Sequence, residues 1–167
     1  MTSRSVAWIS SGWLQLGLRL FIGGIFLFSA VSKLPHHTEF EGIVKDYDML
    51  PDALATAYAN ALPWVELLVG VYLVLGILVK PSAALAILMG VSFFVANVSA
   101  IVRGDDHCGS CFGETFTLPV WQALTIDIFL LAAAVVLILA RSSDPAFTLD
   151  RFISKSSASK APVNLKR

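Results

Sequence analysis

Both cysteines of this 167-residue chain lie in one short segment, RGDDHCGSCFGE, which spans residues 103–114. Cys108 and Cys111 form a C-x-x-C pattern, which can close a small disulfide ring or bind one side of a soft metal ion. His107 directly precedes Cys108, and a protonated imidazole would favour the reactive thiolate, whereas the nearby carboxylates would oppose it. Three chemistries therefore stay open: thiol–disulfide exchange, a structural disulfide that closes the loop, and a metal site.

The metal alternative needs further ligands beside the two cysteines. His107 is one candidate, and His36 and His37, which stand together in an earlier polar segment, are the others. Thiolate and imidazole ligands suit zinc or copper. Adjacent histidines followed by Thr and Glu are more often solvated, so thiol–disulfide exchange is our first hypothesis.

The composition is that of a membrane protein. Hydrophobic residues make up 56% of the chain and charged residues 14%, against roughly 25% charged residues in a water-soluble domain. The formal net charge of zero gives no indication of nucleic-acid binding. Four apolar stretches, at about residues 13–34, 61–79, 82–102 and 118–140, have the roughly 20 residues that a membrane span needs. Backbone amides in lipid are satisfied within helices, so we predict an all-α, four-helix membrane bundle.

This bundle forms a single domain over residues 1–140, followed by a basic, polar and largely disordered tail over residues 141–167. Pro81 suits the first turn of a helix, so "KPS" (residues 80–82) predicts a tight hairpin between the second and third spans. We expect the first span to be retained rather than cleaved as a signal peptide, because it contains Arg19 and lacks a clear small-x-small cleavage site.

The first loop of the bundle, residues 35–60, contains apolar residues at helical spacing: Phe40, Ile43, Val44 and Tyr47. This spacing predicts a short helix that lies on the membrane surface and caps the bundle.

Basic residues near the span ends predict the orientation. Eight of them share one side, and three share the other with several acidic residues. The first group consists of Arg4, Lys80, Arg141, Arg151, Lys155, Lys160, Lys166 and Arg167, and the second of Lys33, Lys45 and Arg103. We therefore predict cytoplasmic termini in an inner (plasma) membrane and a cysteine pair on the outer, periplasmic face. Thiols in that oxidising compartment favour a redox role.

Ionisable residues inside a span are costly and usually face a partner. Depth along the helices, at 1.5 Å per residue, predicts two pairs: Arg19 with Asp127, and Lys33 with Glu66. Such pairs can serve helix register and packing alone. The functional alternative is that Glu66 and Asn97 form part of a polar pocket beneath the cysteines.

Several motifs together resemble one family. Arg19 precedes LFIGGIFLFSAVSKL, and DYDMLP, LPWVELLVG and RGDDHCGSCFGE follow in that order. This arrangement resembles the MauE family, the methylamine-utilisation membrane proteins within the DoxX-like group, over about residues 16–140. The family run is usually C-G-C-F-G, whereas a serine intervenes here to give C-G-S-C-F-G.

The resemblance implies a four-helix membrane protein linked to disulfide formation or maturation of exported proteins, with a fold similar to the DsbB and vitamin K epoxide reductase type. In that family's founding role the client is the disulfide-rich small subunit of methylamine dehydrogenase, and DoxX-like relatives are associated with quinone-linked sulfur oxidation.

On this basis we expect Cys108 and Cys111 to exchange electrons with an exported thioredoxin-like partner or a disulfide-containing client. The chain has no second cysteine pair to relay electrons, so a lipid-soluble quinone is the expected acceptor, between helices near Trp64, Phe93 and Phe94. Whether the protein is an enzyme stays open. The alternative is a non-enzymatic small subunit that stabilises a larger membrane complex, with the cysteine pair as a structural disulfide.

Overall fold

The computed structural model describes residues 12–104, 107–108 and 118–139, with the backbone alone for residues 107, 108 and 118. The predicted tail lies outside this part of the chain. So do residues 105–106 and 109–117 of the cysteine segment and its surroundings, which include Cys111. The described elements, in chain order, are α2 (Gly12–Lys33), α3 (His37–Asp46), α4 (Asp52–Leu75), α5 (Val79–Arg103), β1 (His107–Cys108), β2 (Leu118–Pro119) and α6 (Val120–Leu139).

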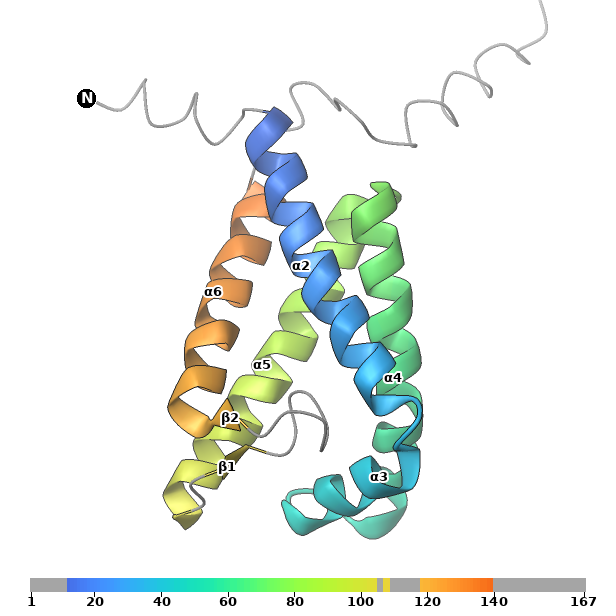
Figure 1. Ribbon diagram of the computed structural model, residues 1–167, viewed down its shortest axis with the longest axis vertical. Helices are drawn as coiled ribbons and strands as arrows, with labels where there is room; N and C mark the ends of the chain where they lie inside the picture. The colour runs from blue at the N-terminus through green and yellow to red at the C-terminus, as the bar shows by residue number, and fades with distance from the viewer. Residues whose placement is uncertain (1–11, 105–106, 109–117, 140–167) are drawn as a thin grey trace, which may run out of the picture.

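The helical prediction is confirmed. Four of the helices, α2, α4, α5 and α6, are long and apolar enough to cross a membrane. α2 packs mainly on α4, and α5 mainly on α6. α3 and the two short strands lie at one end of the bundle, while the start of α2, the α4–α5 turn and the end of α6 lie at the other (Figure 1). The two predicted outer loops therefore share one end of the molecule.

The second span begins earlier than predicted, at Asp52 rather than near residue 61. Pro51 occupies the N-cap and Asp52 supplies an acidic side chain to the first turn, both favourable at a helix start. The alanine-rich turns that follow are helical, but their average hydrophobicity was too low for the sequence to predict them as part of the span. Pro63 lies inside the helix and is buried, which a membrane helix tolerates when its neighbours cover the freed carbonyl.

The turn between the second and third spans lies at residues 76–78, just before the predicted position at residues 80–82. Gly76 takes a left-handed conformation with φ of 70°, and the next amide, of Ile77, donates to the Tyr72 carbonyl at 2.9 Å. This is a glycine-capped helix end. Pro81 falls in the first turn of α5, as predicted.

Close packing of α2 on α4 depends on two glycines. A Cβ added at Gly23 would lie 2.9 Å from the Gly70 carbonyl oxygen, and one added at Gly70 would lie 3.0 Å from the Gly23 carbonyl oxygen. Membrane helices associate largely through van der Waals packing, because lipid provides no hydrophobic driving force between them. Small residues strengthen this packing by letting the two backbones approach closely. The adjacent Gly24, by contrast, faces open space, since an added Cβ there would meet nothing within 4 Å.

The predicted short helix in the first loop is confirmed as α3. Phe40 is buried with 2% of its surface exposed, and α3 packs against α4. Glu41 Oε1 accepts hydrogen bonds from Lys45 Nζ and Thr56 Oγ1, each at 2.6 Å. The Lys45 bond lies within α3, and the Thr56 bond holds α3 against the first turns of α4.

Candidate functional site

The backbone of Cys108 is placed by a two-residue antiparallel ladder. β1 pairs with β2 so that His107 lies opposite Pro119 and Cys108 opposite Leu118. This ladder joins the end of α5 to the start of α6, at the α3 end of the bundle (Figure 1). The side chains of His107 and Cys108, and all of Cys111, lie outside the described part of the chain, so their redox or metal role stays a prediction.

Arg103 connects the end of α5 to the end of α3. Its Nη1 donates to the Asp46 carbonyl at 3.1 Å and its Nη2 donates to the Tyr47 carbonyl. Carbonyls at the end of a helix attract cations. The α3 cap is therefore tied to the first residue of the cysteine segment.

The predicted Lys33–Glu66 pair is confirmed. Lys33 Nζ lies 2.6 Å from Glu66 Oε1, and both side chains have 0% exposure. Ser29 Oγ donates to the same oxygen at 3.0 Å, while Glu66 Oε2 has no hydrogen-bond partner among the described residues. Burial of two charges is costly unless they are paired and hydrogen-bonded. This contact therefore links α2 to α4 where neither side chain can reach solvent.

Two aromatic rings enclose the Lys33 ammonium. Its Nζ lies 5.0 Å from the centroid of Phe40 on α3 and 4.7 Å from that of Phe93 on α5. An ammonium within about 6 Å of a ring face is attracted by the ring quadrupole. Lys33 therefore connects three helices to its own.

The predicted Arg19–Asp127 pair is not found among the described contacts. Arg19 Nε donates to the Leu73 carbonyl at 3.0 Å, and Asp127 Oδ2 accepts from Asn97 Nδ2 at 2.7 Å. The prediction misjudged depth: counted from the end of the bundle that Arg19 is near, Arg19 lies about 10 Å in and Asp127 about 18 Å. Asn97 and Glu66, the two residues of the predicted polar pocket, are both buried, and that pocket stays a prediction.

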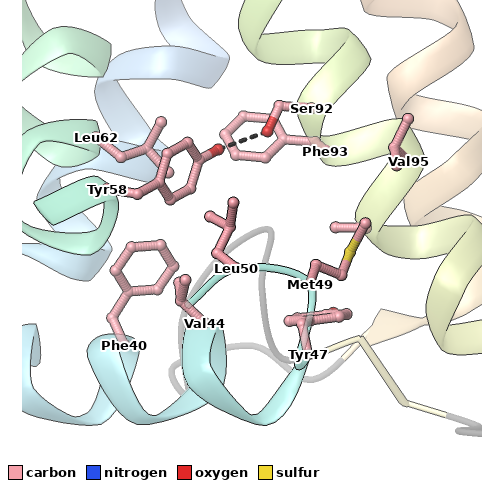
Figure 2. Close-up of a pocket in the computed structure, with 11 residues that line it drawn as sticks. Phe40, Val44, Tyr47, Met49, Leu50, Tyr58, Leu62, Ser92, Phe93 and Val95 are labelled. Carbon is pink, nitrogen blue, oxygen red and sulfur yellow. Dashed lines mark hydrogen bonds between the residues drawn. The ribbon is translucent and has the colours of Figure 1, made fainter. Parts of the chain in front are cut away.

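An apolar pocket of about 290 Å³ lies on the side of α3 that faces the bundle, and we call it the pocket beneath α3 (Figure 2). Residues from α3, the α3–α4 loop, α4 and α5 line it, and four of them are aromatic. Tyr58 Oη and Ser92 Oγ lie 2.6 Å apart in its wall and share a hydrogen bond. The lining residues are Phe40, Val44, Tyr47, Met49, Leu50, Tyr58, Leu62, Ser92, Phe93, Val95 and Ala96.

The pocket only partly matches the predicted cofactor region. Phe93 lines it, but Trp64 lies on the outer surface of the bundle with 58% of its surface exposed. Sequence reasoning missed Tyr58 and Ser92. The signal for Tyr58 was the alanine-rich stretch before residue 61, whose helical character extends α4 over this tyrosine.

The metal alternative stays a prediction, because the described side chains do not include those of Cys108 and Cys111. His36 Nδ1 lies 2.9 Å from Glu39 Oε2, and both side chains are about half exposed. No cluster of three His, Cys, Asp or Glu side chains that could hold a metal ion occurs within residues 12–104 and 119–139. A site that included His107, Cys108 and Cys111 lies outside this search.

Comparison with known protein families gives a match that covers most of the chain. The family described as "Methylamine utilisation protein MauE" matches residues 11–140, which is most of the chain. The chain belongs to the MauE family. The match runs from α2 to the end of α6, so it includes all four spans, both cysteines and every residue of the pocket.

Individual MauE proteins are similar over shorter stretches. The protein from Paracoccus denitrificans is 35% identical over 123 residues, 72% of this chain and 66% of the relative. The protein from Methylorubrum extorquens is 36% identical over 97 residues, 57% of this chain and 52% of the relative. Both are named "Methylamine utilization protein MauE". The chain thus spans about half to two thirds of their length. No solved structure matches it significantly.

Proposed function

We propose that this protein is a membrane thiol–disulfide protein that exchanges electrons with an exported thioredoxin-like partner or a disulfide-containing client. The observation that carries the proposal is the position of the C-x-x-C segment. It is the only cysteine pair in the chain, it lies within the MauE match, and it connects α5 to α6 at the α3 end of the bundle.

The exchange reaction balances within the two proteins. A thiolate of the reduced partner attacks one sulfur of the Cys108–Cys111 disulfide and forms a mixed disulfide, which the partner's second thiol then resolves. The partner gains a disulfide, and Cys108 and Cys111 become two thiols. Two electrons and two protons move from the partner to the pair.

The proposed orientation places the cysteines on the periplasmic side of the inner membrane and both termini in the cytoplasm. The excess of basic residues on the side of the termini supports it. Reporter fusions at Asp106 and Lys160 test it. We expect periplasmic activity at Asp106 and cytoplasmic activity at Lys160, and cytoplasmic activity at Asp106 would contradict the proposal.

We further propose that the pathway served is methylamine utilisation, because the similar curated proteins carry that name. Deletion of the gene should then abolish growth on methylamine while leaving growth on ammonium unchanged. Equal growth of the deletion strain on both would remove methylamine from the proposal without affecting the thiol chemistry.

The redox state of the cysteines in living cells is the direct test. Alkylation with a mass-shifting maleimide should reveal both oxidised and reduced forms. A Cys111→Ser variant should trap a mixed disulfide between Cys108 and an exported partner. A pair that stays oxidised and traps nothing would instead favour a structural disulfide in a non-enzymatic subunit, and stoichiometric co-purification with larger subunits would identify that complex.

The residues present fit a quinone as the group that re-oxidises the pair. The pocket beneath α3 is apolar, lined by aromatic side chains, and carries one hydroxyl pair. When bound, a lipid-soluble quinone would accept two electrons and two protons. Glu66 and Asn97 lie in the interior of the bundle with 0% exposure, where they orient neighbouring helices rather than line this pocket.

A further inference from the structure

We propose that the pocket beneath α3 binds the ring of an uncharged, lipid-soluble carbonyl compound of the quinone class, with the Tyr58–Ser92 hydroxyl pair as its hydrogen-bond donor. The assignment of this ligand as electron acceptor rests on the proposed function. Its binding rests on the pocket alone.

The hydroxyl pair has one proton left to donate. Tyr58 Oη and Ser92 Oγ lie 2.6 Å apart, and either one can be the donor. Each hydroxyl carries one proton and accepts readily, so whichever group donates within the pair, the other keeps a free O–H. The pocket therefore offers a donor to a ligand acceptor, and a carbonyl oxygen is an acceptor that has no proton of its own to satisfy.

The lining residues within the described part of the chain carry no charge. None of the eleven lining residues has an ionisable side chain other than the tyrosines Tyr47 and Tyr58. Lys33 Nζ lies 5.0 Å and 4.7 Å from the ring centroids of Phe40 and Phe93 and is bound to Glu66. A charged headgroup would lose its hydration here without gaining a partner. The ligand is therefore neutral.

The size and walls of the pocket favour a flat ring. A volume of about 290 Å³ lies at the lower limit of small-molecule sites and suits one substituted ring rather than the two chains of a phospholipid. Phe40, Tyr47, Tyr58 and Phe93 supply aromatic walls. Aromatic side chains prefer to stack on or pack edge-to-face against another ring.

An apolar tail has a route out of the pocket. Three lining residues, Met49, Leu50 and Val95, are also exposed on the outside of the molecule, by 46%, 40% and 46%. A hydrocarbon chain attached to the ring could therefore lie along these side chains and continue into lipid. A soluble ligand without a tail would gain nothing from this arrangement.

A hydrogen bond links the pocket to the cysteine segment. Tyr47 lines it, and the Tyr47 carbonyl accepts a hydrogen bond from Arg103. Arg103 ends α5 and is the first residue of the cysteine-bearing segment. A ligand that orders the α3–α4 loop therefore acts on a group that is directly linked to the base of that segment.

Photolabelling of the full chain in lipid nanodiscs tests the site. An azido-substituted ubiquinone analogue is the probe and decylubiquinone the competitor. A Cys108→Ser, Cys111→Ser background removes thiol chemistry, so that labelling reports binding alone. We expect label on peptides that contain Tyr47–Tyr58 or Ser92–Ala96, and loss of that label with competitor.

Two variants and one matched control sharpen the result. Ala96→Phe, which fills the pocket, should reduce labelling at least tenfold, whereas Val91→Phe on the exposed side of α5 should leave it unchanged. Tyr58→Phe combined with Ser92→Ala keeps the shape but removes the donor, and should weaken competition by about three- to tenfold. Label confined to lipid-facing peptides, or equal labelling of the Ala96→Phe and Val91→Phe variants, would overturn the inference.

Failure of this inference is distinguishable from failure of the exchange reaction. Ala96→Phe combined with Cys111→Ser should still trap the mixed disulfide in cells, because partner attack does not need the pocket. Trapping without pocket labelling overturns the ligand site alone. Pocket labelling without any trapping overturns the exchange reaction and leaves the ligand site standing.

Discussion

α2 carries two buried cations, one toward each end, and the bundle accommodates them differently. Lys33, at the α3 end, has 0% exposure and lies 2.6 Å from a carboxylate oxygen of Glu66. Arg19, toward the opposite end, has 3% exposure and donates from Nε to the Leu73 carbonyl. One cation is bound by a side chain of opposite charge, and the other by the carbonyl end of a helix.

This difference has an energetic consequence. A buried ion pair depends on both partners, because removal of either leaves an uncompensated charge in a medium of low dielectric constant. A cation at a helix C-terminus depends instead on backbone carbonyls and the helix dipole, which no substitution removes directly. Arg19 therefore depends on the backbone conformation at Gly76, and Lys33 depends on the Glu66 side chain.

The largest effect is expected from Glu66→Leu, which leaves the Lys33 ammonium buried without its counter-ion. We expect a loss of about 3–5 kcal/mol in the free energy of unfolding, measured by denaturation with SDS in mixed micelles. The Lys33→Met, Glu66→Leu double variant is the control and should recover most of that stability, because apolar replacements of both partners are often neutral. If the double variant is as unstable as the single one, packing rather than charge decides the contact.

Gly76→Ala tests the other cation and should have the next largest effect. Gly76 has φ of 70°, and an added Cβ would lie 1.9 Å from a guanidinium nitrogen of Arg19. Strain and displacement of the guanidinium together should cost about 1–3 kcal/mol. Gly24→Ala is the matched control, since its Cβ meets nothing within 4 Å. Equal stability of the two variants would show that the Arg19 contact contributes little.

A double-mutant cycle on Phe40 separates packing from cation–π attraction at Lys33. Phe40→Leu should destabilise the protein in the native background and destabilise it less in the Lys33→Met, Glu66→Leu background. The difference should be about 0.5–2 kcal/mol, the range for a cation held against an aromatic ring. Identical losses in the two backgrounds would assign the Phe40 contribution to packing alone.

The smallest effect concerns the exposed attachment of α3 and its dependence on pH. The hydrogen bond from Lys45, followed by that from Thr56, lowers the pKa of Glu41 below its ordinary value. A carboxyl group with a lowered folded-state pKa stabilises the fold above its unfolded pKa, and this contribution disappears as the pH falls through the lowered value. Protection of α3 amides from hydrogen exchange, corrected for the intrinsic exchange rate at each pH, should therefore decrease slightly as the pH falls below the ordinary pKa of a glutamate, and Glu41→Gln should remove that decrease. An unchanged acid response in Glu41→Gln would assign it to another group.

The membrane-spanning helices were predictable because each one satisfies its own backbone hydrogen bonds and needs only length and apolarity. The start of α4 was not, because Thr56 and Asn60 interrupt the apolar run although Ala55 and Ala59 face the interior with 0% exposure. At the start of α4 only one face of the helix is buried, and polar residues lie among the alanines. An average hydrophobicity over this stretch is therefore low, and it places the start of the span too late. Tyr58 was assigned to a loop for the same reason.

The candidate site shows the same division. The Lys33–Glu66 pair was predicted correctly from a residue count along the spans, although Glu66 lies in the middle of α4 and only Lys33 ends its helix. Trp64 was placed in the interior, yet it is 58% exposed, because a count does not specify how a helix is rotated about its axis. The Arg19–Asp127 pair was predicted from similar depths, but residue counts along the observed helices place Arg19 about 10 Å and Asp127 about 18 Å from the same end of the bundle.

The sequence by itself determined the membrane class, the four spans, the amphipathic cap and the most chemically distinctive segment, since composition, helical periodicity and residue type are local properties. Tertiary structure alone decided which interior groups meet: the Lys33 ammonium between Phe40 and Phe93, the Arg19 guanidinium at Gly76, and the Tyr58–Ser92 pair in the pocket. The physical reason is that these contacts join different helices, so they depend on helix rotation, crossing and close approach, which the whole bundle sets together.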